Sequence, residues 1–106
     1  MHVISNSFSI NMLEPETEKV LLRMEHIEPN EVPRDSVSVV GHENTAQIIS
    51  GLVGFEVPCN RATFELTKEV ELYVAQYTGP RLPEGATELP EGARMYFWKV
   101  WMEVMG

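Results

Sequence analysis

Cysteine and basic residues are scarce in this sequence. The one cysteine, Cys59, excludes an intrachain disulfide and a zinc site made of several thiolates. Only 8 lysines and arginines stand against 16 aspartates and glutamates, which gives a formal net charge of −8. Such a chain is poorly suited to coating long duplex DNA, because neutralising phosphates supplies most non-specific affinity. A small anionic ligand held by one or two local arginines is compatible with this charge.

The sequence also lacks a long hydrophobic run. No stretch approaches the roughly 20 apolar residues that a bilayer-spanning helix needs. The first residues contain neither the basic segment nor the apolar segment that is typical of a signal peptide. We therefore expect a cytoplasmic protein without a membrane partner, and a single free thiol fits that compartment. With 43% hydrophobic and 23% charged residues, the chain is expected to fold as one domain over residues 1–106.

The hydrophobic pattern predicts an α/β fold, with about five strands in a mixed β-sheet and one or two helices packed on it. Runs of β-branched and aromatic residues that alternate with polar residues are typical of strands. For residues 19–27 a short helix is the alternative to a strand. The predicted strands cover residues 2–8, 19–27, 61–66, 70–77 and 94–102.

Two of these strands are predicted to form a hairpin. Residues 61–66 alternate strictly, which places Ala62, Phe64 and Leu66 on an inward face. A short turn and then a β-rich run at residues 70–77 follow directly, as in a hairpin.

The clearest helix is predicted over residues 43–53. Gly41 permits a tight entry, and Asn44 or Thr45 is the expected N-terminal cap. Apolar residues recur at three- and four-residue spacing, which gives one hydrophobic stripe. The stripe consists of Ala46, Ile49, Leu52 and Val53.

Residues 79–93 are predicted to form a long surface loop. The segment is rich in glycine and proline and contains the pentapeptide Leu-Pro-Glu-Gly-Ala twice, beginning at Leu82 and at Leu89. Two such short copies do not make a solenoid repeat. Long loops inside compact domains are often functional.

His42 is the most informative histidine, because it directly precedes the predicted helix. Free backbone N–H groups and the helix dipole make this position favourable for an anion. A histidine there can donate a hydrogen bond to a phosphate or protonate a leaving oxygen near neutral pH. The alternative is a histidine that only caps the helix or faces solvent.

Other chemistry is poorly supported by the residues. The lone aspartate, Asp35, lies in a proline-rich loop, so neither an aspartate cluster nor a Ser-His-Asp triad is indicated. The sequence shows no metal motif and no phosphate-binding glycine loop. Arg61 and Arg81 are either ordinary surface cations or, together with His42, the local positive charge of an anion site.

Five ordered blocks of this sequence resemble the viral ring nuclease family, anti-CRISPR proteins that counter type III immunity. The N-terminal block reads NSFSINML, and the block at the start of the helix reads GHENTAQI. The resemblance spans nearly the whole chain. The blocks cover residues 6–13, 41–48, 60–61, 72–76 and 81–85.

The resemblance implies a homodimer that binds cyclic tetra-adenylate across its two-fold axis. Members of the family cleave this ring without a metal or other cofactor, by attack of a ribose 2′-hydroxyl, and they release di-adenylates with a 2′,3′-cyclic phosphate. Such cleavage switches off type III CRISPR signalling. No duplex nucleic acid is expected as a partner.

The matching positions also imply roles for residues. His42 is expected to be the general acid, and Arg61 to hold a phosphate and stabilise transition-state charge. Arg81 and Glu84 are expected on a loop that closes over the ring, with Glu84 paired to His42. The family usually has a helix after this loop, whereas here the repeated pentapeptides take its place. The ligand is expected to be lined near its ribose and phosphate by Asn6, Ser9 and Asn11.

Two other readings have a different functional class. A non-catalytic protein that sequesters cyclic oligoadenylate needs the arginines but not the histidine. A small interaction protein could instead dimerise through the strand that contains Trp98 and Trp101, without a nucleotide ligand.

Overall fold

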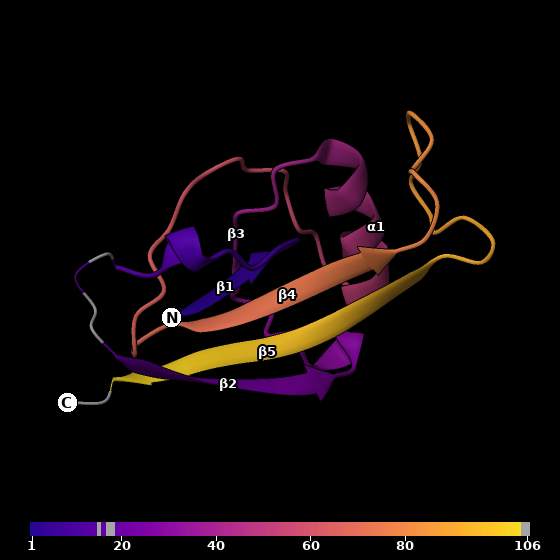
Figure 1. Cartoon of the computed structure of the whole chain (residues 1–106). Coiled ribbons are helices and arrows are strands. Elements are labelled where there is room, and N and C mark those ends of the chain that lie inside the picture. Colours follow the sequence, from indigo (N-terminus) through magenta and orange to yellow (C-terminus); the bar gives the residue numbers. More distant parts are fainter. Residues whose placement is uncertain (15, 17–18, 105–106) are drawn as a thin grey trace.

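A five-stranded mixed sheet forms the centre of the fold in this computed structural model, which describes residues 1–14, 16 and 19–104. The strand order is β2-β5-β4-β1-β3. β1 runs parallel to both of its neighbours, whereas β5 runs antiparallel to both of its own (Figure 1). The strands are β1 (His2–Ser5), β2 (Val20–Ile27), β3 (Val37–Ser38), β4 (Glu71–Thr78) and β5 (Arg94–Val104).

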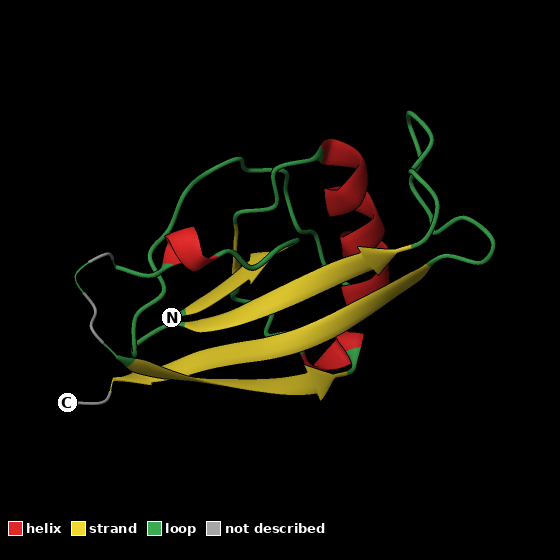
Figure 2. Ribbon diagram, viewed as in Figure 1, coloured by secondary structure: helices red, strands yellow, loops and turns green. Residues whose placement is uncertain are grey.

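One α-helix, α1 (Glu43–Val53), lies against the sheet at the end toward which β1 and β4 point (Figure 2). Two short 3₁₀ helices, η1 (Ile10–Met12) and η2 (Pro29–Glu31), lie in the connections before β2 and β3. Within the described residues, no helix is long and apolar enough to cross a membrane. The predicted α/β class, the number of strands and the helix boundaries are confirmed.

The sheet carries a hydrophobic cluster on each face. On one face Ala46, Ile49 and Val53 of the predicted α1 stripe pack with the middle of the sheet, and Ile49 and Phe97 are almost completely buried there. Leu52, the fourth residue of that stripe, is 37% exposed instead. On the other face the described residues form no α-helix, and the N-terminal segment and residues 61–66 supply the cover instead. Burying both faces with so few elements requires the long connections to act as part of the core.

The C-terminal end of α1 is fixed by a glycine and a serine. Gly54 adopts a left-handed conformation with φ 85°, and its N–H donates to the Ser50 carbonyl at 3.1 Å. The Ser50 hydroxyl donates to the Ala46 carbonyl at 2.7 Å and accepts from the Val57 N–H at 2.8 Å. These bonds satisfy polar groups at the helix end and turn the chain back along the sheet.

The predicted strand at residues 61–66, and with it the hairpin, is wrong. This segment is extended but pairs with no strand, because its backbone bonds go elsewhere: the Leu66 N–H donates to the Met12 carbonyl at 2.7 Å. Leu66 is fully buried and Phe64 half-buried, whereas Ala62 is exposed. The alternation therefore reflects packing of a connection over the sheet face rather than a sheet ladder.

Three smaller differences concern element ends. β1 ends at Ser5 instead of residue 8. The strand β3 was not predicted, because its two residues are too few to show an alternating pattern in the sequence. His42, rather than Asn44 or Thr45, occupies the N-cap of α1.

A polar network ties the strands together at the end of the sheet remote from α1. Two carboxylate oxygens contact the His2 ring nitrogens, Asp35 Oδ1 at 2.7 Å and Glu71 Oε1 at 2.9 Å. The second Glu71 oxygen lies 2.9 Å from Lys99 Nζ. The hydrogen bond from Lys99 is the main cause that lowers the pKa of Glu71, with His2 adding to it.

Removing a core side chain of α1 is expected to destabilise the fold. Ile49→Ala leaves a cavity between helix and sheet and should lower the free energy of unfolding by about 2–5 kcal/mol. Leu52→Ala is the matched control, because Leu52 lies on the same helix but is 37% exposed, and it should cost about 1 kcal/mol or less. Denaturant unfolding of both variants checks this; equal losses would contradict the packing described.

The Glu71 network predicts a pH dependence of stability. A carboxyl whose pKa is lowered by folding stabilises the protein above its ordinary pKa of 4.5 and loses that effect as the pH falls below it. The difference in unfolding free energy between wild type and Glu71→Gln should be full at about pH 6 and shrink toward about pH 3. Glu103→Gln is the control, because its pair with Arg23 is about half exposed on both sides and contributes little. A difference that stays constant across this range would contradict the account.

Candidate functional site

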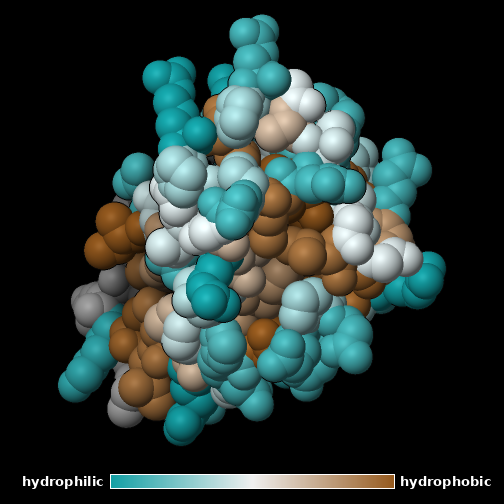
Figure 3. Space-filling model, turned by 90° about the vertical axis from the view of Figure 1, so that its right-hand side faces the viewer, coloured by the Kyte–Doolittle hydropathy of each residue, from teal (hydrophilic) through white to brown (hydrophobic). Residues whose placement is uncertain are grey.

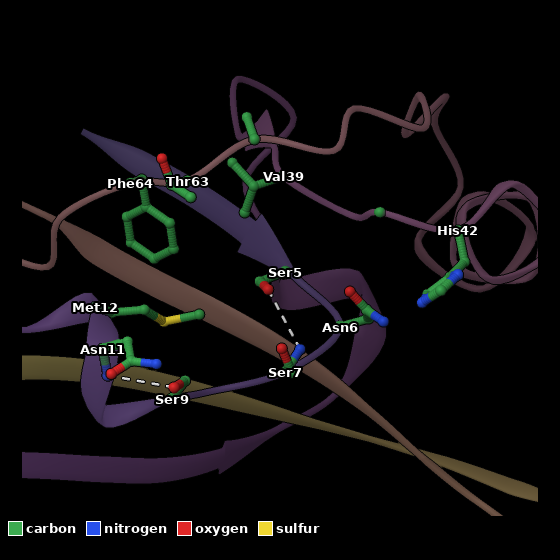
Figure 4. A pocket seen from close by; sticks show the side chains of 12 residues that line it. Ser5, Asn6, Ser7, Ser9, Asn11, Met12, Val39, His42, Thr63 and Phe64 are labelled. Carbon is green, nitrogen blue, oxygen red and sulfur yellow. Dashed lines mark hydrogen bonds between the residues drawn. The ribbon is translucent and has the colours of Figure 1, made fainter.

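A polar cleft forms where β1 and β3 end. Because the two strands are parallel, their carboxyl ends meet at one edge, and the residues after them lie close together. Asn6 and Ser7 follow β1, and Gly41 and His42 follow β3. The cleft between them has a volume of about 300 Å³ (Figure 4). It is lined by Ser5, Asn6, Ser7, Ser9, Asn11, Met12, Val39, Gly41, His42, Ala62, Thr63 and Phe64.

His42 reaches the cleft because it is the N-cap residue of α1. Its backbone is extended, with φ −130° and ψ 128°, and its side chain makes no capping hydrogen bond. In Figure 4 the imidazole projects into the cleft on the side where Asn6 lies. The ring is therefore exposed at the positive end of the helix dipole, where anions bind favourably.

The predicted residues Asn6, Ser9 and Asn11 all line this cleft. Ser9 is the N-cap of η1, and its hydroxyl accepts a hydrogen bond from the Asn11 N–H at 3.2 Å. Ser5 similarly accepts from the Ser7 N–H at 3.2 Å. These bonds fix the backbone, while the amides of Asn6 and Asn11 make no hydrogen bond with the described part of the chain and can meet a ligand (Figure 4).

Arg61 lies beside the residue that precedes His42. The extended segment is held there by Asn60, whose N–H donates to the Val40 carbonyl at 2.7 Å and whose amide donates to the Ser38 carbonyl at 2.8 Å. The Arg61 guanidinium then reaches the Gly41 carbonyl at 3.4 Å. The structure thus brings Arg61 beside Gly41, one residue before the N-cap of α1. Arg61 lines neither cleft that His42 borders, so its expected contact with a ligand phosphate stays a prediction.

A second cleft, of about 430 Å³, also borders His42. It opens between the start of α1 and the base of the long loop, and Arg81 lines it. The loop base is tightly closed: a side chain at Gly79, which has φ +153°, would lie within 2.8 Å of the Ala93 Cβ. The hydroxyl of Tyr77 also donates to the Pro80 carbonyl. Arg81 is therefore held near His42 by the closed neck of the loop.

Glu84 lies farther out on the same loop, at an exposed turn. The Ala86 N–H donates to the Pro83 carbonyl at 3.1 Å, and Gly85 takes the positive φ of 80° that this turn requires. Residues 90–93 repeat the same turn. Glu84 lines neither cleft that His42 borders, so the expected pair between these two residues stays a prediction.

A third cleft, of about 470 Å³, adjoins the first and shares Asn6 and Ser7 with it. It lies over the face of the sheet that carries no α-helix and also includes Gln76 of β4. Sequence reasoning missed Gln76, Ser7 and Thr63. For Gln76 and Ser7 the one available signal was position, since polar residues at the carboxyl ends of strands often contact ligands. Thr63 lies in a connection outside the sheet and carried no such signal. Cys59 is exposed and lines none of these three clefts.

Metal ligands do not cluster in the part of the chain that the structure describes, since no group of three or more His, Cys, Asp or Glu side chains is placed to hold an ion. The chemistry of the site instead depends on one imidazole, two guanidinium groups, amides and hydroxyls. This set suits an anionic ligand with hydroxyl and amide partners, such as a phosphodiester.

Comparisons with known proteins identify the family. A family model described as STIV B116-like matches residues 2–93. Among solved structures, B116 of Sulfolobus turreted icosahedral virus (STIV) superposes with a TM-score of 0.71 at 20% sequence identity, covering 94% of this chain and 97% of that protein. A search of curated proteins gives no match. The two positive results agree, and the chain belongs to the STIV B116-like family.

Proposed function

We propose that this protein is a ring nuclease that binds cyclic tetra-adenylate and cleaves it without a metal. The observation that carries the proposal is the position of His42. It is the N-cap residue of α1, its side chain makes no capping hydrogen bond, and it borders two clefts. The resemblance of five sequence blocks to viral ring nucleases gives the substrate. The virus named in the structural comparison is compatible with an anti-CRISPR role.

The reaction is an intramolecular transesterification, in which a ribose hydroxyl of cyclic tetra-adenylate attacks a phosphate of the same molecule. A ribose 2′-oxygen attacks the adjacent phosphate and loses its proton to solvent water, while the bond from phosphorus to the 5′-oxygen breaks. The imidazolium form of His42 donates its proton to that 5′-oxygen, which leaves as a hydroxyl. Two such events in one ring produce two di-adenylates with 2′,3′-cyclic phosphates.

Neighbouring side chains hold the phosphate during this step. In this proposal Arg61, which contacts the Gly41 carbonyl, and Arg81, which lines the second cleft with His42, supply positive charge where negative charge develops. In the same proposal the amides of Asn6 and Asn11, which line the cleft with His42, bind the ribose and phosphate oxygens. Because these contacts are local, the acidic net charge of −8 does not prevent an anionic ligand from binding.

A homodimer is part of the proposal. The cleft beside His42 measures about 300 Å³, and drug-sized ligands fill clefts of about 300–1,000 Å³. A ring of four nucleotides exceeds a cleft of that size, so a second copy is needed to enclose it. The two-fold symmetry of the ring fits the two-fold axis of a dimer.

Sequestration without cleavage is the second candidate. It is favoured by the position of Glu84, which lines neither cleft at His42. Glu84 therefore supplies no carboxylate in these clefts to stabilise the protonated imidazole of His42. Binding by the arginines and amides does not need that carboxylate.

His42→Ala separates these candidates. We expect wild type to convert radiolabelled cyclic tetra-adenylate in EDTA, and the variant to bind the ring but turn it over about 10²- to 10⁴-fold more slowly. Chromatography of the products and calorimetric binding measure the two effects. Equal turnover would remove His42 from the reaction, and binding without turnover by wild type would establish sequestration.

Arg61→Ala tests the phosphate contact. We expect weaker ring binding and slower cleavage together, by about tenfold or more for each, because a charge-assisted bond is lost. Arg34→Ala is the matched control: Arg34 also reaches a glycine carbonyl at 3.4 Å, but that of Gly54, at the C-terminal end of α1 and not at the end where His42 lies. If Arg61→Ala and Arg34→Ala give the same ring affinity, Arg61 is not part of the site.

A further inference from the structure

We propose that the third cleft binds a purine base of the ligand and that Trp98 is the surface on which this base stacks. The inference rests on the proposed function, because the base belongs to the ring whose phosphate lies at His42. Neither the sequence blocks nor the comparisons assign a role to Trp98.

The third cleft continues the phosphate site across the sheet. Asn6 and Ser7 line both clefts, so a nucleotide whose phosphate and ribose meet His42 has its base directed past these two residues. The next surface it meets is formed by neighbouring strands, since Trp98 of β5 is paired with Val74 of β4 and with His26 of β2. The volume of about 470 Å³ admits a purine.

The chemistry of the third cleft suits a neutral aromatic ring. None of its seven lining residues carries a charge. Trp98 is half-buried, and Met24 beside it is 56% exposed, which leaves apolar surface open to a ligand. Stacking on an aromatic side chain is a common way of holding a nucleobase, and a methionine adapts to the edge of an aromatic ring.

Two amides at the same cleft favour adenine over a simple apolar group. Asn6 and Gln76 both line it, and side-chain amides pair with the N6 and N7 atoms of adenine. An aliphatic side chain from another protein would leave both amides without partners. The combination of an aromatic floor and amide edges therefore points to an adenine base.

Further aromatic side chains lie around Trp98. On the side of the molecule drawn in Figure 3, a patch of hydrophobic surface is exposed near the middle of the view and is bordered by hydrophilic side chains. Tyr96, on the same face of β5 as Trp98, is 39% exposed. Three aromatic rings lie close together there. The centre of the His26 ring is 5.1 Å from the centre of the Trp98 ring and 6.0 Å from that of Tyr96.

The chain contains a built-in control for this proposal. Its two tryptophans, Trp98 and Trp101, stand on opposite faces of β5 because side chains alternate along a strand. Trp101 lies beside Lys99, whose ammonium is 5.2 Å from the centre of its ring, on the face away from the cleft.

Tryptophan emission gives the first test. In His42→Ala/Trp101→Phe the ring is not consumed and Trp98 is the sole reporter; we expect cyclic tetra-adenylate to quench its emission by at least about half at saturation. His42→Ala/Trp98→Phe, which reports from Trp101, should change by less than about a tenth. Ribose 5-phosphate, which lacks a base, should quench neither.

Affinity gives the second test. Trp98→Leu should weaken binding of the ring by about 5- to 150-fold, the range for one stacked base, while Trp98→Phe keeps most of the affinity. Trp101→Leu should leave the dissociation constant within about twofold.

The outcomes separate the two proposals. If calorimetry shows ring binding while Trp98 emission and the affinity of Trp98→Leu are unchanged, the stacking site is wrong and the proposed function stands. If the ring does not bind wild type at all, both fail. Loss of binding in Trp98→Phe as well as Trp98→Leu, with Trp98 emission unquenched, would also contradict stacking, since an aromatic surface is retained.

Discussion

The parallel pairing of β1 with β3 and β4 is the constraint on which the site depends. β1 is only four residues long, yet Val3 and Ile4 are almost completely buried between the two hydrophobic clusters. Because all three strands point the same way, the segments that leave β1 and β3 meet at one edge, beneath the start of α1. That meeting brings the polar N-terminal segment to His42, across 36 positions of sequence.

Charge is distributed in keeping with this arrangement. The chain is acidic, but its site edge combines a helix N-terminus with arginines from two connections, while carboxylates at the opposite end are engaged by His2 and Lys99. The cationic side chains near His42 are thus few and local, a pattern that suits the proposed small phosphate ligand better than an extended polyanion. Arg61 belongs to the connection that covers one face of the sheet, and Arg81 to the base of the loop at residues 79–93. Both arginines are therefore positioned by the packing of connections and not by a helix.

Local periodicity predicted the elements that are defined by burial of one face. The stripe through Ala46 and Ile49 predicted the limits of α1, and the aromatic run at residues 94–102 is a strand whose side chains join the hydrophobic clusters on both faces of the sheet. Residues 61–66 show the limit of the same reasoning, since alternating burial also arises in an extended connection without sheet pairing. The polar residues of the site were placed by resemblance to known blocks, and the geometry now groups Asn6, Ser9, Asn11 and His42 around one cleft. The third cleft could not be predicted, because it depends on strand register between β2, β5 and β4.

The central claim is that a phosphodiester of cyclic tetra-adenylate lies in the cleft at His42. Nuclear magnetic resonance with a 2′-O-methylated ring, which has no attacking hydroxyl, tests it directly by mapping which residues of the wild-type protein respond. The account predicts the largest shifts at residues 6–11, 41–42 and 61–63, with those around the His2 and Glu71 network unchanged. Shifts confined to other surfaces, or none at concentrations of ring that saturate cleavage, would contradict it.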